Sequence, residues 1–296
     1  MSRLDSTWSQ RLPYLAAAAR RTRCGSVVHD RRHDAEMRGI ALIGSRDYAP
    51  GDDYRRVDWY RCARHDELLT RQSLPAPSRP VRVLVDTSRR MGLGEPTKLD
   101  VACRIAGALA YVAFDLGCEV GLATYADRIV DYQPPCRDRS RRMAFAQGLA
   151  EASPASGSGS LETVAQQLAR LDPARGIAVV VSDLLQCDAR YEPRFAAGLS
   201  ALAGHGYEVR VVQIGDPQEL RPQILGEQRL VDLQHGNSWE GTITEAALGR
   251  YHRRVEGFLD QIARFCASRR MRLVRVWTDW RSEERRVGKE CVSECR

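Results

Sequence analysis

The chain has 296 residues, 43% of them hydrophobic, which is enough to bury the core of one α/β domain with an appendage, or of two small domains. Its 45 Lys and Arg residues are nearly matched by 38 Asp and Glu residues, so the net charge of +7 favours a solvated, Arg-rich surface over a dedicated basic stripe. The sequence contains neither a run of about 18 uncharged apolar residues nor a signal-peptide layout, so we expect a cytoplasmic protein without a membrane span.

Short β-branched runs alternate with helical stripes from residue 81 onward. The first predicted strand, 81–86, is followed by a helix that Thr97 caps. Two strands then flank a turn at 126–127, which is too short for a parallel crossover, so the second strand must run antiparallel at a sheet edge. The later predicted elements are helices at 161–171, 194–206 and 251–269 and strands at 176–183, 208–214 and 272–277.

This alternation predicts an α/β fold with a mostly parallel sheet and helices on both faces. In such sheets, ligands bind beyond the carboxyl ends of the strands, where the strand order reverses. Asp86 and Asp183 end two predicted strands, Ser88 follows the first of them, and Ser160 closes the flexible loop "SPASGSGS". If the two strands are neighbours, these groups face one crevice, and such an oxygen-only set suits Mg²⁺ or Mn²⁺.

A second segment, "YAPGDDYRRVDWYRCAR" at 48–64, concentrates arginines and acids around a tryptophan. Its Pro-Gly pair suits the centre of a type II turn, and the acids that follow are close enough in sequence to pair with arginines. We interpret the segment as a structural or partner-docking network. A nucleic-acid contact and a metal-dependent hydrolytic site are the alternatives, and the excess of arginine disfavours the second. The residues assigned to the network are Pro50, Gly51, Asp52, Asp53, Arg56, Asp58, Trp59 and Arg64.

Several of these motifs resemble known families. "VLVDTSRRM" resembles the Asp-x-Ser-x-Ser metal motif of von Willebrand factor A domains, "GSGS" falls where that fold places its Thr loop, and "VVVSDL" resembles its Asp-bearing third strand. The 48–64 segment closely resembles the signature of the family catalogued as domain of unknown function 58, and the likeness runs from Arg20 to Trp280. The resemblance implies a non-enzymatic bacterial protein with a von Willebrand A-like (Rossmann-type) fold that helps MoxR-type AAA+ ATPases to mature other complexes.

One position departs from the metal motif, because Arg90 stands where the second serine is expected. A guanidinium group there is able to neutralise Asp86 and Asp183 by itself. Two hypotheses therefore stay open. Either Asp86, Ser88, Ser160 and Asp183 hold a divalent cation, or the site is a degenerate one in which Arg90 substitutes for the metal.

We divide the chain into an appendage at 1–80 that carries the signature, a von Willebrand A-like domain at 81–280 and a tail at 281–296. The tail changes composition abruptly and lacks apolar periodicity, which is typical of a non-native or disordered extension. Nine scattered cysteines without a C-x-x-C pair are expected to be reduced thiols. The predicted function is that of an adaptor, without catalytic residues, between a MoxR-type ATPase and a client protein complex. A nucleic-acid-binding protein and a metal-dependent hydrolase are the alternatives.

Overall fold

The computed structural model describes residues 6–25, 42–47, 62, 69–73, 79–157, 160–172, 174–186, 193–232 and 237–279. The chain divides into two compact units, Met1–Ala16 with Pro80–Arg296, and Ala17–Arg79. Apart from Cys62, the signature segment lies outside the described residues, and so does the tail at 281–296. What the sequence predicts for both segments therefore stays a prediction.

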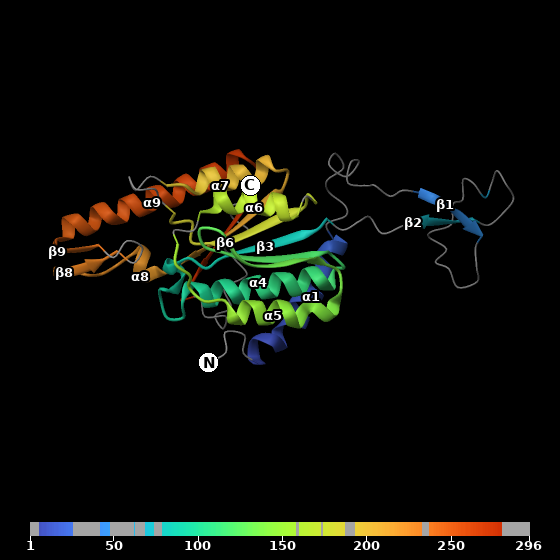
Figure 1. Cartoon of the computed structure of the whole chain (residues 1–296), viewed down its shortest axis with the longest axis horizontal. Coiled ribbons are helices and arrows are strands. Elements are labelled where there is room, and N and C mark those ends of the chain that lie inside the picture. The colour runs from blue at the N-terminus through green and yellow to red at the C-terminus, as the bar shows by residue number, and fades with distance from the viewer. Residues whose placement is uncertain are drawn as a thin grey trace. The chain divides into compact units, whose positions relative to one another are not determined.

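The larger unit is built on a six-stranded sheet with the order β10-β7-β6-β3-β4-β5 (Figure 1). Neighbouring strands pair in parallel except β4 and β5, which form the antiparallel edge expected from the 126–127 turn. The predicted α/β fold with a mostly parallel sheet is confirmed. The strands are β3 (Val81–Asp86), β4 (Val120–Tyr125), β5 (Ile129–Cys136), β6 (Ile177–Ser182), β7 (Glu208–Gly215) and β10 (Arg272–Trp277).

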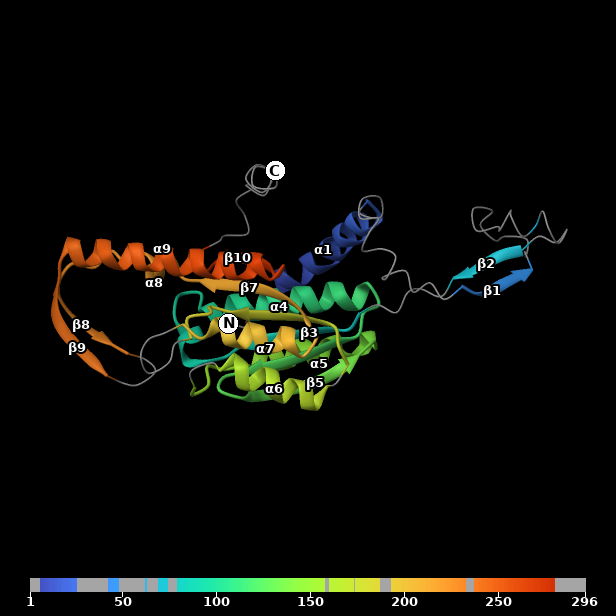
Figure 2. The same cartoon turned by 90° about the horizontal axis from the view of Figure 1, so that it is seen from above.

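Helices cover both faces of this sheet (Figures 1 and 2). On one face α4 and α5 pack together through Phe114 and Phe145, whose ring centroids lie 5.2 Å apart. On the other face α6, α7 and α9 form a core that includes Phe195. Helix α4 begins after Thr97 because Thr97 and Asp100 form a reciprocal capping box. The helices of this unit are α4 (Lys98–Asp115), α5 (Arg142–Glu151), α6 (Leu161–Leu171), α7 (Phe195–Gly204), α8 (Pro217–Leu220) and α9 (Glu245–Ser268), with 3-10 turns η3 (Arg89–Gly92) and η4 (Arg139–Arg141).

Helix α1 (Ser6–Gly25) was not predicted from the sequence. Its Leu12 and Ala16 are buried, and the Trp8 ring lies against Gly107 of α4, where a Cβ would come within 2.9 Å of that ring. The absence of a side chain at Gly107 therefore makes room for α1. None of the described helices is both long and apolar enough to cross a membrane.

Two antiparallel hairpins form two-stranded sheets of their own. Strands β8 (Gly226–Val231) and β9 (Ser238–Ile243) form one between β7 and α9, and the Leu230–Trp239 pair on it is exposed. The sequence analysis missed it because these short strands are mostly exposed and lack a regular apolar alternation. Strands β1 (Leu42–Asp47) and β2 (Leu69–Ser73) form the other, in the smaller unit, and confirm the expected β-structure there.

Candidate functional site at the carboxyl ends of the strands

Asp86 and Asp183 lie at the carboxyl ends of neighbouring parallel strands. Strand β3 pairs with β6 with Val85 opposite Val181, so Asp86 and Ser182 come next on the two strands. The strand order reverses here, because the chain continues from β3 to β4 on one side while β6 lies on the other. Both acids are buried, with 0% and 1% of their surface exposed. The topology thus brings the two strand-end acids to one place.

Hydrogen bonds hold both carboxylate oxygens of Asp86. The Ser88 N–H donates to Oδ1 at 2.8 Å, and the Ser182 hydroxyl donates to Oδ2 at 2.6 Å. Burial raises the pKa of the Asp86 carboxyl, and the charge of Asp183 nearby raises it further. Asp86 is therefore the acid of the pair that takes up a proton more readily.

Two cationic side chains contact Asp183. Lys98 Nζ lies 2.9 Å and Arg90 Nε 3.5 Å from its Oδ2, while the Leu185 N–H donates to Oδ1 at 3.0 Å. Burial acts to raise the pKa of the Asp183 carboxyl, but the positive charges of Lys98 and Arg90 outweigh it and lower that pKa to about 2. Asp183 is thus a carboxylate at neutral pH, and the chain itself supplies its counter-ions.

Lys98 is the functional residue that the sequence analysis missed. It is the first residue of α4, its side chain is 0% exposed, and Nζ also lies 2.5 Å from Oε2 of Glu219 in α8. Burial acts to lower the pKa of Lys98, but the carboxylates of Asp183 and Glu219 outweigh this effect and raise it. A cation in the first turn opposes the helix dipole, so the sequence alone offered no reason to place Lys98 in a site, and its role depends on carboxylates from distant segments.

The residues of the predicted serine set lie in different surroundings. Ser88 is buried, and its hydroxyl makes no hydrogen bond within the part of the chain that the structure describes. The Ser160 hydroxyl instead lies 3.0 Å from Thr163 Oγ1 in the first turn of α6. The loop before Ser160 does reach the strand end, because the Ala155 N–H donates to the Thr87 carbonyl at 2.7 Å. This loop therefore borders the site, whereas the Ser160 hydroxyl is engaged with α6.

The backbone just beyond Asp183 is strained. Leu184 has a φ of 57°, in the left-handed region that a branched side chain adopts at a cost of about 1 kcal/mol or more. Its side chain is fully buried, and its N–H donates to the Ser182 hydroxyl at 3.0 Å. The same hydroxyl thus fixes both the Asp86 carboxylate and the turn that follows Asp183.

These residues do not fit a divalent cation. The fold implies a metal held by Asp86, Ser88 and Asp183, but the Asp183 carboxylate already faces an ammonium and a guanidinium group, which would repel another cation. Both oxygens of Asp86 are engaged by hydrogen-bond donors of the chain. Over the described ranges, no group of three or more His, Cys, Asp and Glu side chains converges to form a metal site.

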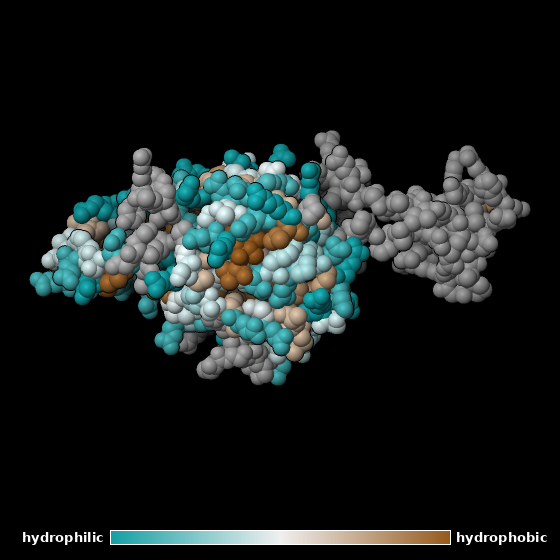
Figure 3. All heavy atoms as spheres, viewed as in Figure 1, coloured by the Kyte–Doolittle hydropathy of each residue, from teal (hydrophilic) through white to brown (hydrophobic). Residues whose placement is uncertain are grey.

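A small crevice adjoins the charged cluster at the ends of β6, β7 and β10. Trp277 forms part of its wall and lies over Gly215, where a Cβ would come within 2.5 Å of the indole ring. The polar groups that line it are Asp183, Gln213, Glu219 and Arg275. Elsewhere the described surface is mainly hydrophilic in the view of Figure 3, with an apolar strip at the sheet edge between α4 and α6. The carboxyl end thus combines buried charge with a small crevice of mixed polar and apolar lining.

The strand order and the strand-end acids define a von Willebrand A-like domain. Six strands are doubly wound with one antiparallel edge, and the Asp86-x-Ser88 pair and Asp183 occupy the strand ends where that fold carries its metal motif. Arg90 and Lys98 make this version of the motif a cationic one.

Residues 44–256 match the family described as "Protein of unknown function DUF58", and the chain belongs to this family, as the 48–64 segment predicted. "Uncharacterized protein Rv1480" of Mycobacterium tuberculosis and "Uncharacterized protein Mb1516" of Mycobacterium bovis are each 27% identical to it over 224 residues, which cover 74% of this chain and 69% of theirs.

Solved structures similar to the chain include two from Bacteroides species. The conserved hypothetical protein BatB from Bacteroides thetaiotaomicron is 16% identical with a TM-score of 0.42, over 67% of this chain and 90% of that one. An aerotolerance-related membrane protein from Bacteroides fragilis is 18% identical with a TM-score of 0.41, over 67% of this chain and 92% of that one.

Proposed function

We propose that this protein is a non-enzymatic interaction module that binds its partner on the loops at the carboxyl ends of the sheet. The partner that we propose, from the family resemblance alone, is a MoxR-type AAA+ ATPase. The protein then acts in the cytoplasm as an adaptor that presents a client complex to the ATPase.

The observation that supports docking is the gathering of three loops at one edge of a rigid sheet. The loop after Asp86 is joined to the loop before Ser160 by the 2.7 Å hydrogen bond between Ala155 and Thr87. The third loop follows Asp183, which Lys98 holds at 2.9 Å. Below these loops, Lys98 and Arg90 are already engaged by Asp183, an arrangement that suits recognition better than proton transfer to a substrate.

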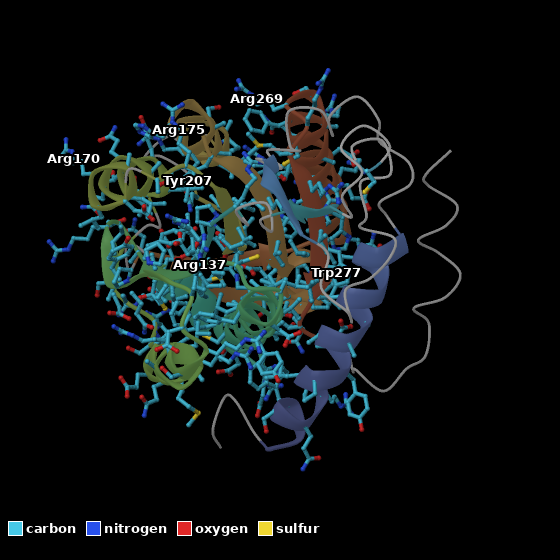
Figure 4. The ribbon with its side chains drawn as sticks, turned by 90° about the vertical axis from the view of Figure 1, so that its right-hand side faces the viewer. Arg137, Arg170, Arg175, Tyr207, Arg269 and Trp277 are labelled. Carbon is cyan, nitrogen blue, oxygen red and sulfur yellow. The ribbon has the colours of Figure 1, made fainter. Side chains whose placement is uncertain are left out.

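Co-purification from the native host tests the proposal with two matched charge reversals. Arg89→Glu changes an exposed residue in the loop after Asp86, and Arg175→Glu makes the same change at an exposed residue before β6, at the opposite end of the sheet (Figure 4). We expect the unmodified protein and Arg175→Glu to recover the ATPase and Arg89→Glu to lose most of it. Equal recovery by all three proteins would exclude the strand-end loops as the docking surface. Turnover of a phosphoester by the purified protein would instead support the hydrolase alternative.

Nucleic-acid binding is the second candidate, because exposed arginines gather at the amino ends of the strands. Arg170, Arg175 and Arg269 lie at this end of the sheet in Figure 4. Binding to phosphates would weaken steeply between low and moderate salt, and Arg175→Glu would weaken it further. Recovery of nucleic acid without an ATPase, lost in Arg175→Glu and kept in Arg89→Glu, would favour this function over the adaptor.

A further inference from the structure

We propose that the Lys98 ammonium group is a built-in cation that takes the place of a divalent metal at the carboxyl end of the sheet. The net charge of the loops at the carboxyl end of the sheet would then be the same in the presence and in the absence of divalent metal. This inference concerns the isolated protein, so it does not depend on which partner binds.

The Lys98 ammonium group lies between carboxylates from different elements, as a bound metal ion would. Its Nζ lies 2.9 Å from Asp183 at the end of β6 and 2.5 Å from Glu219 in α8, while its own backbone begins α4. One buried charge thus links three elements that are distant in sequence. A bound metal ion makes links of this kind through its ligands.

The cost of burying an ammonium group indicates that Lys98 is a permanent part of this charge cluster. A buried ammonium group is strongly destabilising unless carboxylates compensate for its lost hydration, and the start of a helix adds a further unfavourable term. Lys98 is fully buried and has two carboxylate partners, one of which, Asp183, is itself fully buried. Because a divalent ion would need the same carboxylate oxygens, Lys98 and a metal exclude each other.

The Ser88 hydroxyl is an independent sign of a replaced ion. It is buried beside Asp86 and makes no hydrogen bond of ordinary geometry among the described residues, although it is close enough to Asp86 to act to lower the pKa of that carboxyl. A buried hydroxyl without a partner is costly, and its position in the Asp-x-Ser motif makes it a ligand-type oxygen aimed at no ligand. With Lys98 and Arg90 neutralised, the oxygens nearest to a cation at the place of Lys98 Nζ would be those of Asp183 and Glu219, and oxygen is the ligand atom that Mg²⁺ prefers.

The test measures thermal unfolding with EDTA and with saturating Mg²⁺. For the unmodified full chain we expect the two melting temperatures to agree within about 1 °C. For Lys98→Met/Arg90→Ser we expect Mg²⁺ at about 100 times its Kd to raise the melting temperature by about 5 °C or more. Adding Asp183→Asn to the double variant should abolish this rise, which ties the metal to the proposed oxygens.

Two further proteins keep the proposal testable if the double variant does not fold. Arg90→Ser alone retains Lys98, so it should remain unresponsive to Mg²⁺, and a rise equal to that expected of the double variant would make Arg90 the substitute and overturn the proposal. A Mg²⁺-dependent rise in the unmodified chain that Asp183→Asn removes would also overturn it. So would a folded double variant that does not respond. None of these outcomes bears on recovery of the ATPase, so the two proposals fail separately.

Discussion

The sheet carries a buried charge cluster at each end, and the two clusters differ in composition. At the amino end, Arg82 of β3 donates from Nε to Asp172, whose backbone carbonyl accepts a hydrogen bond from the Tyr207 hydroxyl at 2.9 Å. At the carboxyl end, the cations Lys98 and Arg90 face Asp183, and further acids lie beside them. Arg82 and Asp172 are 2% and 6% exposed, so both ends bury their charges.

The difference lies in how the charges match. The amino end pairs one base with one acid, which is an arrangement that ties α6 to β3 and supports stability. The carboxyl end sets three acids, Asp86, Asp183 and Glu219, against two bases, and it includes a buried hydroxyl without a partner and a strained turn. A buried atom without a hydrogen-bond partner occurs at both ends, since Arg82 Nη1 is one as well, so the distinguishing features are the unmatched charge and the strained turn, which are typical of a functional site.

The largest effect is expected for Lys98→Met. It leaves the buried Asp183 and the partly buried Glu219 without their main cation, so the free energy of unfolding in EDTA should fall by about 3–5 kcal/mol. Urea denaturation at neutral pH measures it. A loss below about 1 kcal/mol would mean that Lys98 is not the main counter-ion of the cluster.

Arg82→Met should have the next largest effect. The free energy of unfolding should fall by about 3 kcal/mol, because Asp172 would be left buried without its cation. The comparison between the two ends predicts that Mg²⁺ restores none of this loss, since the amino end pairs a single acid with a single base. Equal recovery of Arg82→Met and Lys98→Met by Mg²⁺ would show that the recovery is not specific to the carboxyl end.

The sequence was sufficient to predict that Asp86 and Asp183 lie together at the carboxyl end of the sheet, but it was not sufficient to predict that Lys98 contacts Asp183. Alternating strands and helices predict the parallel order and place Asp86 and Asp183 at one edge, because the carboxyl ends of parallel strands share an edge. Lys98 is 85 residues from Asp183 and 121 residues from Glu219 along the chain, so no local spacing predicts either contact.

Other elements were missed for a similar reason. The buried residues of α1 become recognisable only against Gly107 of α4, and the hairpin β8–β9 exposes most of its side chains and so lacks an apolar pattern. Arg90 was recognised as a cation beside the acids because the motif itself specifies a residue at that position. Sequence patterns of this kind thus report local periodicity and strand ends, whereas contacts between distant segments require the structure.

The pH dependence of stability distinguishes the two strand-end acids of the carboxyl end. The Asp183 pKa is lowered from 3.8 to about 2, so its contribution is fully present above pH 3.8 and is lost as the pH falls toward 2. The difference corresponds to about 2 kcal/mol. Asp86, whose pKa is raised by burial, acts in the opposite direction, because its protonation on acidification relieves a cost. Between about pH 4 and pH 2, the free energy of unfolding should therefore fall more steeply with decreasing pH in the unmodified protein than in Asp183→Asn. Parallel curves would contradict the assignment of Asp183 as the permanently charged acid.

The smallest effects are expected at two serines that both adjoin Asp86. Ser182→Ala removes the hydroxyl that donates to Asp86 at 2.6 Å and accepts from Leu184 at 3.0 Å, so we expect a loss of about 1.5–3 kcal/mol in urea denaturation. Ser88→Ala removes a hydroxyl without a partner and keeps the backbone N–H that binds Asp86, so it should leave stability unchanged or raise it by up to about 1 kcal/mol. If Ser88→Ala lowers the free energy of unfolding as much as Ser182→Ala does, the Ser88 hydroxyl has a hydrogen-bond partner in solution. Because the assay contains EDTA, that partner would be a water molecule or a group of the chain rather than a metal. If Ser88→Ala becomes costly only when Mg²⁺ is added to Lys98→Met/Arg90→Ser, the Ser88 hydroxyl takes part in binding the metal once the two cations are gone.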